Sequence, residues 1–402
     1  MYTILSYKSL YTNLSSHFPH LPHLFPPQSD SFGYDQETKE YVTKIVNSGG
    51  ILKRHTITPT SVSPDKFIPN MSITPDTRGK LWEECAKAMA IESSRAAIKA
   101  WSRGSASDIT HVVTHSCTGF SAPGIDFFLI NELGLKPSTR KLGVNFMGCF
   151  GGFSAMYVAK QIVEADKSES GAVVLVCCVE TCSLHVSDNK SKELIVGNTL
   201  FADGSSAAII TRANFVSSSP RSATGTVGGS FADEKTNTEG MDLTVSLPNT
   251  DRYGGWVLGN MMSEIVANSA EAMTWKQSVT PGKYDMFLDK AIPKALSSLF
   301  LTNGLSMLSK VGISNVWNCG WAIHPGGKGI LTAFEKSLSG LGIHADGVNH
   351  SYDVLSQYGN MSSATILFVL KRVLSSSKKN EVFTCGFGPG LSVEYGRLYR
   401  VQ

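Results

Sequence analysis

Apolar residues recur in the same order of patterns in two parts of this 402-residue chain. The first part shows a strand pattern with a turn, then a turn with a helical pattern, then a second strand pattern, at residues 109–119, 147–165 and 171–180. The second part repeats that order at residues 316–327, 358–374 and 382–390. Short apolar runs between turn residues are typical of buried strands, so the repetition predicts an internal duplication.

The two repeated helices predict how the layers are stacked. Residues 150–159 and 361–370 are apolar or small almost all round, which is typical of helices buried between layers. We therefore expect an α/β protein with five layers, α/β/α/β/α, made of two similar halves. Residues 217–240 are rich in Ser, Gly and Thr and lack periodicity, which favours a loop or boundary. We place the division there, between halves at 1–230 and 231–402.

A long helical pattern at residues 74–101 predicts a helix with a structural role. Asp76 is a candidate N-cap, because a carboxylate can accept hydrogen bonds from the unpaired backbone N–H groups of a first turn. The apolar stripe that we expect to face the core runs through Leu81, Cys85, Ala88, Met89 and Ile98.

Composition limits the partners of the protein. With 42% hydrophobic and 17% charged residues the chain can bury a large core, and its net charge of +3 is too small to indicate a nucleic-acid partner. No apolar run approaches the ~18 residues of a membrane span. Residues 1–29 contain no Asp or Glu, but Lys8 is their only basic residue and prolines interrupt any signal core. An irregular N-terminus is favoured over a cleaved targeting segment, and we expect a cytoplasmic protein.

The eight cysteines show no framework of regular spacings. Cys177 and Cys178 are adjacent in an apolar strand pattern, which favours reduced thiols over disulfides. Cys178, Cys182 and His185 have spacings that a zinc site could use, but no second ligand pair follows at a suitable distance. Packing in a core or pocket is therefore favoured over a metal site.

Cys149 is the candidate nucleophile. It comes after Gly148 and opens a buried helix, so its sulfur should lie near unpaired backbone N–H groups at the positive end of the helix dipole. That location favours a thiolate over an ordinary thiol with a pKa of ~8.5. The alternative is a small buried cysteine at a position where a larger side chain would clash.

His324 and Asn360 occupy the equivalent turns of the second half. The histidine ends an apolar strand before a glycine-rich turn, where it can pair with a thiolate, although a hydrogen-bonded core histidine would look the same. Asn360 supplies an amide donor that can face an oxyanion, or it can cap a helix. Together with Cys149 they indicate nucleophilic catalysis, because all three occupy equivalent turns of a duplicated scaffold.

Five motifs carry a family resemblance in their order along the chain. They are LFADGSSAA at 200–208, GFGPGLSVE at 386–394, and GCFGG, HPGGKGIL and YGNMSSATILFVL around Cys149, His324 and Asn360. With them the chain resembles the type III polyketide synthases, relatives of chalcone synthase with a duplicated, thiolase-like five-layer fold. β-Ketoacyl carrier-protein synthase III shares a Cys-His-Asn triad but is not expected to show HPGG or GFGPG. A catalytically silent acyl-CoA-binding protein of this fold would not need Cys149.

The resemblance implies a mechanism without metal or organic cofactor. Cys149 would take a starter acyl group from its coenzyme A (CoA) thioester. His324 and Asn360 would hold the thioester carbonyl of malonyl-CoA and stabilise the enolate that decarboxylation leaves. The partners implied are acyl-CoA, malonyl-CoA and a second copy of the chain in a homodimer.

The resemblance also implies roles for residues around the triad. Phe201 would be a gate between the CoA tunnel and the cavity. The substrate cavity would be lined by Cys117, Thr118, Cys182, His185, Gly388 and Pro389, and the residues expected to bind CoA are Lys53, Arg54, Gly326 and Gly327.

Two departures from plant chalcone synthases bear on the substrate. Ala122 stands where those enzymes carry a methionine that reaches into the neighbouring subunit, and Cys117 replaces a threonine. The stretch THSCTGFSAPGID is more similar to microbial and protist alkylpyrone or alkylresorcinol synthases. Smaller side chains leave room for an alkyl chain, so we expect a fatty acyl-CoA starter and an alkylpyrone or alkylresorcinol/phloroglucinol-type product.

Overall fold

The apolar runs form the strands of one ten-stranded sheet that passes through both halves of the chain. The computed structural model describes residues 2–6, 9–10, 34–57, 74–186, 190–213, 215, 255–279, 281, 283–345 and 347–400. The sheet strands are β1 (Tyr2–Ser6), β2 (Ser9–Leu10), β3 (His111–His115), β4 (Arg140–Gly143), β5 (Val173–Thr181), β6 (Asp203–Arg212), β7 (Trp256–Ile265), β10 (Cys319–Ile323), β11 (Glu381–Gly388) and β12 (Ser392–Arg400). A separate hairpin contains β8 (Met273–Gln277) and β9 (Tyr284–Leu288).

The strand order repeats between the two halves, as the sequence pattern predicts. Along the sheet the order is β10-β11-β12-β7-β1-β6-β5-β3-β4, with β2 paired to β6. In the first half β3 pairs parallel with β5, and β5 pairs antiparallel with β6. The second half repeats this arrangement with β10, β11 and β12. The duplication is therefore confirmed, and β1 joins the two half-sheets by pairing with both β6 and β7.

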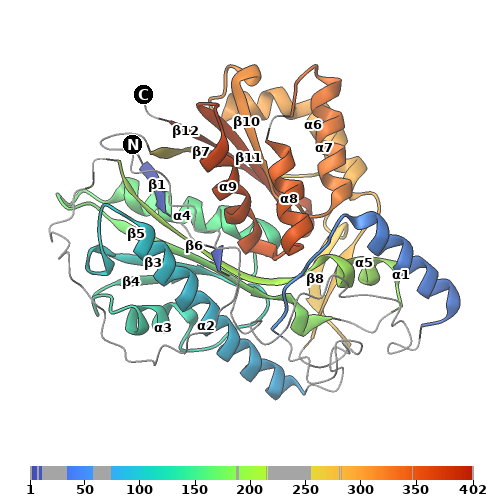
Figure 1. The fold of residues 1–402 in the computed structure, drawn as a ribbon, viewed down its shortest axis with the longest axis horizontal. Coiled ribbons are helices and arrows are strands. Elements are labelled where there is room, and N and C mark those ends of the chain that lie inside the picture. The colour runs from blue at the N-terminus through green and yellow to red at the C-terminus, as the bar shows by residue number, and fades with distance from the viewer. Residues whose placement is uncertain are drawn as a thin grey trace, which may run out of the picture.

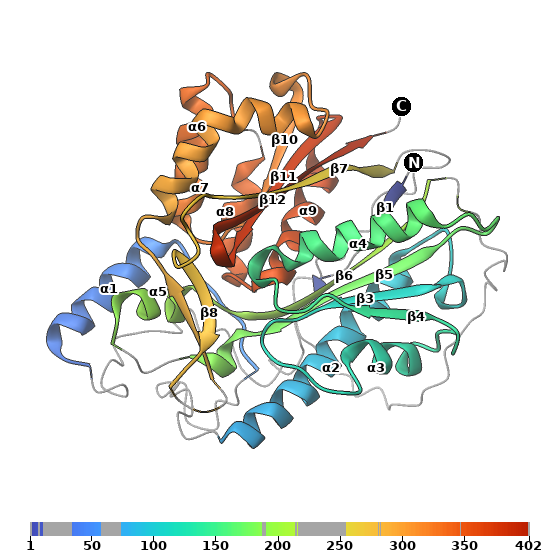
Figure 2. The ribbon, with the colours of Figure 1, turned by 180° about the vertical axis from the view of Figure 1, so that it is seen from behind.

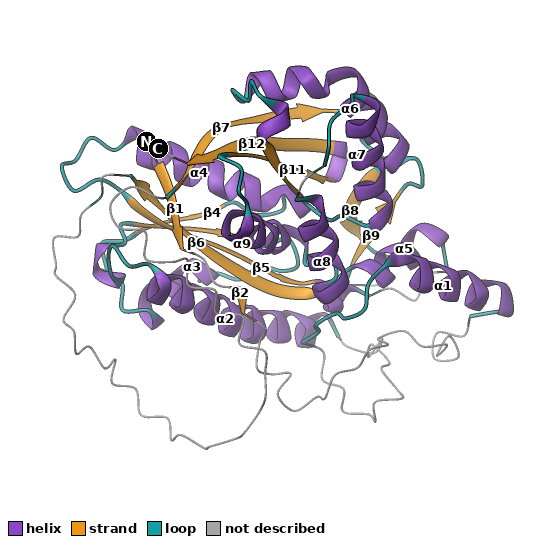
Figure 3. Ribbon diagram, turned by 45° about the horizontal axis from the view of Figure 1, so that its top comes forward, coloured by secondary structure: helices purple, strands orange, loops and turns teal. Residues whose placement is uncertain are grey.

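Helices cover both outer faces and fill the space between the half-sheets (Figures 1 and 2). Their bounds are α1 (Gln36–Gly49), α2 (Pro75–Ala100), α3 (Ile125–Glu132), α4 (Gly151–Ala165), α5 (Lys192–Leu200), α6 (Ile292–Lys310), α7 (Lys328–Gly340), α8 (Val348–Tyr358) and α9 (Thr365–Ser376). Helices α2 and α3 cover the first half-sheet, α6 and α7 lie outside the second, and α4 and α9 lie between them. At one end, α1 and α5 lie beside the β8–β9 hairpin (Figure 3).

Strand β5 shows why the strand patterns are continuously apolar rather than alternating. Val174 and Val176 face the central core with α4 and α9, while Val173 and Leu175 face α2 and α3. All four are fully buried, because the sheet has helices on both faces. Helices α4 and α9 have half-sheets on both sides, which explains why the pattern of each is apolar almost all round.

Helix α2 differs from its sequence prediction in two details. Thr74, not Asp76, is the N-cap: its side chain accepts from the Thr77 N–H, and Pro75 begins the helix. The predicted stripe is rotated by about one residue, because Trp82 packs against the turn at Gly119 and draws its own face inward. Of the predicted stripe, Met89 is buried, Ala88 is exposed, and Leu81, Cys85 and Ile98 are partly buried.

Some predictions concern parts of the chain that the structure does not describe. The predicted division near residue 230 and the 217–240 segment lie outside the described residues, as does most of the N-terminal segment 1–29. Among the residues that are described, no helix is long and apolar enough to cross a membrane.

The first turn of α4 meets the start of α9 at backbone distance. A Cβ atom on Gly152 would lie 2.6 Å from the carbonyl oxygen of Ser363 and 2.8 Å from Ile366 Cγ2. Real Cβ contacts are longer than this, so one helix would have to move. Gly152 therefore allows α4 and α9 to approach closely, and the turns that precede the two helices are brought together as well.

Gly152→Ala is expected to lower the free energy of unfolding by about 2 kcal/mol, because the added methyl group overpacks a backbone contact. Gly79→Ala is the matched control, since Gly79 is exposed on α2 with nothing within 4 Å of its Cβ position. This control should stabilise the protein by about 0.5–1 kcal/mol. Thermal midpoints at one scan rate measure both changes. Equal midpoints for the two variants would show that α4 and α9 can separate freely.

Candidate active site

Cys149 lies in a single 3₁₀ turn, Gly148–Phe150, that leads into α4. Gly148 has φ of +72°, and a Cβ atom there would lie 2.3 Å from Pro389 Cδ. A Cβ atom on Gly388 would lie 2.4 Å from Phe150 Cδ1. Gly388 and Pro389 thus support the Cys149 turn from the end of β11. They were expected to line the substrate cavity, but they are not among the residues that line the pocket.

Asn360 brings the second half of the chain to the sulfur. Its Nδ2 lies 3.9 Å from Cys149 Sγ and 3.5 Å from the Gly326 carbonyl oxygen, while its Oδ1 accepts from the Ser362 N–H at 2.9 Å. The acceptor role of Oδ1 fixes the amide orientation, so the donor end of the side chain faces the thiol. The backbone of Asn360 pairs with Phe201 in a parallel bridge.

His324 follows β10 directly and is fully buried. Its backbone N–H donates to the Cys385 carbonyl at 2.8 Å, which extends the pairing of β10 with β11 past the last residue of the strand. Neither ring nitrogen has a hydrogen-bond partner among the described residues. Buried polar groups without a partner are costly, which makes this imidazole a candidate for binding a group that is not part of the protein.

Burial sets the protonation state of both reactive groups. It raises the pKa of Cys149 to about 12, with hydrogen bonds from Ser362 and Asn360 opposing the rise and the Glu180 charge adding to it. It also lowers the pKa of His324 to about 3. Burial therefore opposes the resting thiolate that the start of the helix was expected to favour.

Five predicted residues meet in one pocket beside this site. They are Cys117, Thr118, Cys182, His185 and Phe201, and they form part of the lining of a hollow of about 510 Å³, a volume that includes open solvent. Seven further lining residues were missed by the sequence analysis: Val186, Leu194, Gly197, Asn198, Trp275, Met286 and Ser362. Trp275 and Met286 belong to the β8–β9 hairpin, which forms one wall of the pocket, and Trp275 Nε1 donates to the Cys117 carbonyl at 2.8 Å.

His185 is a fixed part of the pocket wall. The Tyr284 N–H donates to its Nδ1 at 3.3 Å, so the ring proton is on Nε2, which donates to the Thr118 carbonyl at 2.6 Å. The ring stands edge-on to Trp275, with centroids 5.2 Å apart. Burial lowers the pKa of His185 to about 4. Since both nitrogens are already bound by the backbone, this histidine shapes the pocket and transfers no proton.

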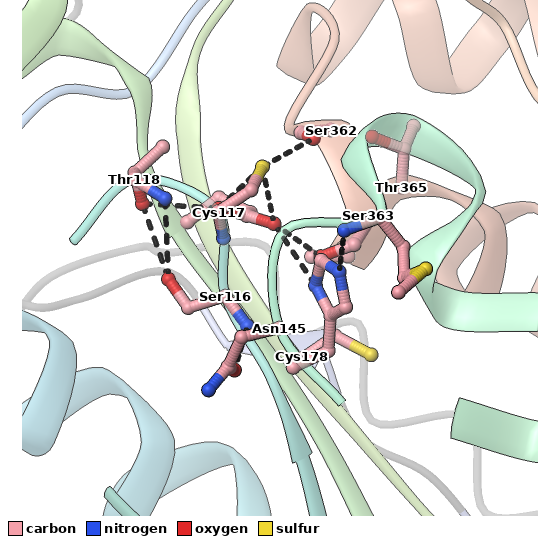
Figure 4. A network of polar contacts seen from close by, with 12 residues as sticks. Ser116, Cys117, Thr118, Asn145, Cys178, Ser362, Ser363 and Thr365 are labelled. Carbon is pink, nitrogen blue, oxygen red and sulfur yellow. Dashed lines mark hydrogen bonds and ion pairs between the residues drawn. The ribbon is translucent and has the colours of Figure 1, made fainter. Parts of the chain in front are cut away.

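Glu180 is a fully buried carboxylate that the sequence analysis did not single out. Its partners Cys117, Thr118 and Ser363 are labelled in Figure 4. It accepts from the Cys117 N–H and Thr118 Oγ1, each at 3.0 Å, and from Ser363 Oγ at 2.5 Å. His115 Nδ1 lies 3.3 Å away. Burial opposes ionisation, but His115 and Ser363 together hold the pKa of Glu180 below its ordinary value. The carboxylate therefore ties the residues behind the pocket into one network.

The signal for Glu180 was present in the sequence. A single charged residue near the end of the run VVLVCCVET in a strand buried on both faces requires several hydrogen-bond partners. The three donors and His115 meet that requirement, but Ser363 lies 183 residues away from Glu180, so the sequence alone does not identify them all.

The residues predicted to bind CoA fall in three different places. Lys53 is exposed, Gly326 and Gly327 form the turn between β10 and α7, and these three stay predictions. Arg54 turns inward instead: its Nη1 donates to the carbonyl oxygens of Asn198 and Phe201, at 2.7 and 2.8 Å. The Nη1 atom of Arg54 is therefore engaged inside the protein, and the binding of a CoA phosphate by Arg54 also stays a prediction.

The three residues considered as zinc ligands, Cys178, Cys182 and His185, do not lie together. Cys178 packs in the central core, whereas Cys182 and His185 line the pocket. Within the described ranges, no group of three or more His, Cys, Asp or Glu residues is placed to hold a metal ion.

Comparisons with known proteins cover both halves of the chain. The family models "Chalcone and stilbene synthases, N-terminal domain" and "Chalcone and stilbene synthases, C-terminal domain" match residues 29–214 and 260–400. "Alpha-pyrone synthesis polyketide synthase-like Pks18" of Mycobacterium tuberculosis is 29% identical over 372 residues, which is 91% of this chain and 84% of that protein. "Probable polyketide synthase 1" of Dictyostelium discoideum is 29% identical over 375 residues; the chain spans about a tenth of its length.

Solved structures agree with these matches. The C-terminal type III polyketide synthase domain of Steely1, a type I/III hybrid from Dictyostelium, superposes with a TM-score of 0.76 at 25% identity, covering 100% of this chain and 99% of that one. A type III pentaketide synthase from Neurospora crassa has a TM-score of 0.74 at 22% identity with 100% of both chains covered, which supports the fold.

His324→Ala is expected to slow alkylation of Cys149 by iodoacetamide about tenfold or more near neutral pH. Without the imidazole, the thiol must ionise against burial alone, so its pKa stays near 12 and the rate rises only at strongly alkaline pH. Asn360→Ala should slow the reaction less, because it removes a single hydrogen bond of 3.9 Å that lowers the pKa of Cys149. Peptide mass spectrometry against pH follows Cys149 separately from the other cysteines. Equal effects of the two substitutions would contradict this difference in roles.

Proposed function

The chain belongs to the chalcone and stilbene synthase family and is a type III polyketide synthase, an enzyme that uses acyl-CoA and malonyl-CoA, and we propose that its starter is a fatty acyl-CoA. In this proposal the acyl group is loaded on Cys149, extended with malonyl-CoA and cyclised to an alkylpyrone or alkylresorcinol/phloroglucinol-type product. The observation that carries the proposal is the Asn360 amide aimed at Cys149 Sγ, with the unpaired imidazole of His324 next to Gly326 and the pocket beside them.

Loading uses the neutral thiol and imidazole together. As Sγ of Cys149 attacks the thioester carbonyl, its proton passes to His324, so thiolate and imidazolium form as a pair. Collapse of the tetrahedral intermediate breaks the bond to the CoA sulfur, and the imidazolium returns the proton to that leaving thiolate. The acyl group remains on Cys149, and His324 is neutral again.

Decarboxylation uses the same imidazole as a donor. The carbon–carbon bond of the malonyl group breaks, carbon dioxide leaves, and the electron pair moves into an enolate whose oxygen accepts from Asn360 Nδ2 and a ring N–H of His324. No protein group holds either ring nitrogen in the described structure, so both tautomers of His324 are accessible. One tautomer accepts the thiol proton during loading, and the other donates during decarboxylation.

Condensation then restores the nucleophile. The enolate carbon attacks the thioester carbonyl on Cys149, the new carbon–carbon bond forms, and the sulfur leaves as a thiolate beside His324. The lengthened chain is now on CoA and can be returned to Cys149 for another round. Holding both partners in place supplies most of the rate acceleration. The chemistry in this proposal requires no metal or organic cofactor.

An aliphatic starter is supported by the pocket lining. Val186, Leu194 and Met286 supply apolar surface, while Cys117 and Cys182 are small. Each methylene buried in such a pocket is worth about 0.8 kcal/mol. The name of the mycobacterial relative, an alpha-pyrone synthesis protein, fits the same product class. The match of both halves to chalcone and stilbene synthases favours this reading over a carrier-protein synthase, and Cys149 with its partners favours it over a silent binder.

A second copy of the chain is the partner that the surface supports. Exposed apolar side chains follow the neighbouring parallel strands β3 and β4: Phe120 is 73% exposed, Phe146 51% and Met147 37%. The exposed Ala122 lies in the same loop as Phe120. Clustered exposed apolar residues mark interaction sites, and a homodimer would cover them.

Incubation with malonyl-CoA and a series of saturated and aromatic acyl-CoAs tests the proposal. We expect product masses that equal the aliphatic starter plus whole ketide units, and an acyl adduct on the intact protein that Cys149→Ala abolishes. An adduct that persists in Cys149→Ala, or that maps to Cys117 or Cys182, would refute the nucleophile. Conversion of aromatic thioesters alone would refute the aliphatic starter and leave the mechanism in place.

Cys117→Phe should shorten the preferred starter, because the larger ring fills pocket volume beside Phe201. The expected result is a fall in kcat/KM of about tenfold or more for long acyl-CoAs, with short ones comparatively spared. Cys117→Ser is the matched control: it keeps the size and can still donate to Glu180, so its chain-length profile should be unchanged. A uniform fall for all starters would instead make Cys117 a general packing residue.

A further inference from the structure

Arg54 contacts two segments of the chain, the one that carries Phe201 and the one that carries Asn360. We infer that it is a positioning residue that fixes Phe201 and Asn360 relative to each other, an inference that rests on the roles proposed for those two residues. Residues 51–57 run from α1 towards β6 and contact the ends of α5 and α8 on the way. Arg54 is in the middle of that stretch.

The guanidinium binds the end of α5. The last carbonyls of a helix have no partner within the helix, and a cation there also complements the negative end of the helix dipole. Nη1 of Arg54 satisfies the carbonyls of Asn198 and Phe201, so one nitrogen holds both the last turn of α5 and the backbone of the gate. Burial lowers the pKa of Arg54 to about 10, which leaves it charged at neutral pH.

The aliphatic part of the same side chain packs against the Asn360 segment. A Cβ atom on Gly359 would lie 2.8 Å from Arg54 Cγ and 3.1 Å from its Cδ. The next residue is Asn360, whose N–H donates to the Leu200 carbonyl at 2.9 Å and whose carbonyl accepts from Ala202 at 2.8 Å. Arg54 therefore touches both strands of the short bridge in which Phe201 and Asn360 are paired.

The residues that follow Arg54 are bound to Asp203, at the start of β6. The Asp203 N–H donates to the His55 carbonyl at 2.9 Å, and the buried Asp203 carboxylate accepts from the N–H groups of Ile57 and Ser183, each at 2.7 Å. The positive charge of Arg54 also attracts this carboxylate. Loss of the guanidinium would remove the hydrogen bonds that join residues 51–57 to the carbonyls of Asn198 and Phe201.

Removal of the Arg54 guanidinium is expected to displace the Asn360 amide and to leave the affinity for CoA unchanged. Decarboxylation depends on the position of the amide relative to the enolate oxygen, and small displacements of such groups cost large factors in rate. Attack by Cys149 on a small alkylating reagent depends on His324 and involves Asn360 much less. The two reactions therefore separate a positioning role from a general packing role.

The test compares Arg54→Met and Arg54→Lys with Arg95→Met, a control in which another arginine, exposed on α2, loses a hydrogen bond to a carbonyl. The substrates are malonyl-CoA and malonyl-pantetheine, which lacks the phosphates of CoA. We expect Arg54→Met to lower kcat for decarboxylation of both about tenfold, with KM and Cys149 alkylation changed less than about threefold. Arg54→Lys should recover part of kcat, and Arg95→Met should match the unmodified enzyme. If Arg54→Met does not fold, a lowered kcat in Arg54→Lys with unchanged KM supports the same role.

Three outcomes would overturn the inference. A rise in KM for malonyl-CoA but not for malonyl-pantetheine would make Arg54 a phosphate ligand after all. Equal losses of decarboxylation and alkylation would make it a packing residue. Unchanged decarboxylation in the Arg54 variants, while Asn360→Ala abolishes it, would show that the bridge holds without the guanidinium. If Asn360→Ala itself retains decarboxylation, the proposed function fails first, whatever Arg54 does.

Discussion

The backbone contact between the two central helices is the constraint on which the site depends. Helices α4 and α9 lie between half-sheets and are apolar on nearly every side, so the protein gains most by bringing them together. Gly152 lets their first turns meet at Ser363. The turns before those helices then converge, which places Cys149 opposite Asn360. The reactive geometry is thus a consequence of core packing and needs little additional structure of its own.

The same burial governs the chemistry. Withdrawal from water disfavours both a lone thiolate and a lone imidazolium, so burial favours a neutral thiol at Cys149 and a neutral imidazole at His324. A thiol that is neutral at rest is protected from stray electrophiles. Glu180 shows the opposite solution: a buried charge persists there because donors from several elements surround it.

Apolar periodicity was enough to predict β3, β5, β10 and β11, the two central helices and the duplication, because each depends on burial of whole faces. The equivalence of turns also led to Cys149 and Asn360. The internal hydrogen bonds of Arg54 could not be predicted, since a basic pair beside a turn looks exposed, whereas its acceptors lie 144 and 147 residues away. Thr74 replaced Asp76 as a cap because two neighbouring residues with similar propensity competed. The protonation states of Cys149 and His324 could not be predicted, since they depend on how deeply each side chain is buried, and no local sequence pattern indicates this.

Cys149 and Asn360 meet across 211 residues of sequence, and this separation bears on how the chain folds as it is made. The first half-sheet and α2 can assemble early, but α4 has no second face to pack against until α9 leaves the ribosome. Contacts of such long range form slowly and leave apolar surface exposed in the meantime. The nascent chain therefore exposes the apolar surface of α4 until α9 has been synthesised. The supply of chaperones, rather than the stability of the folded protein, should then limit the yield of folded enzyme in a foreign host.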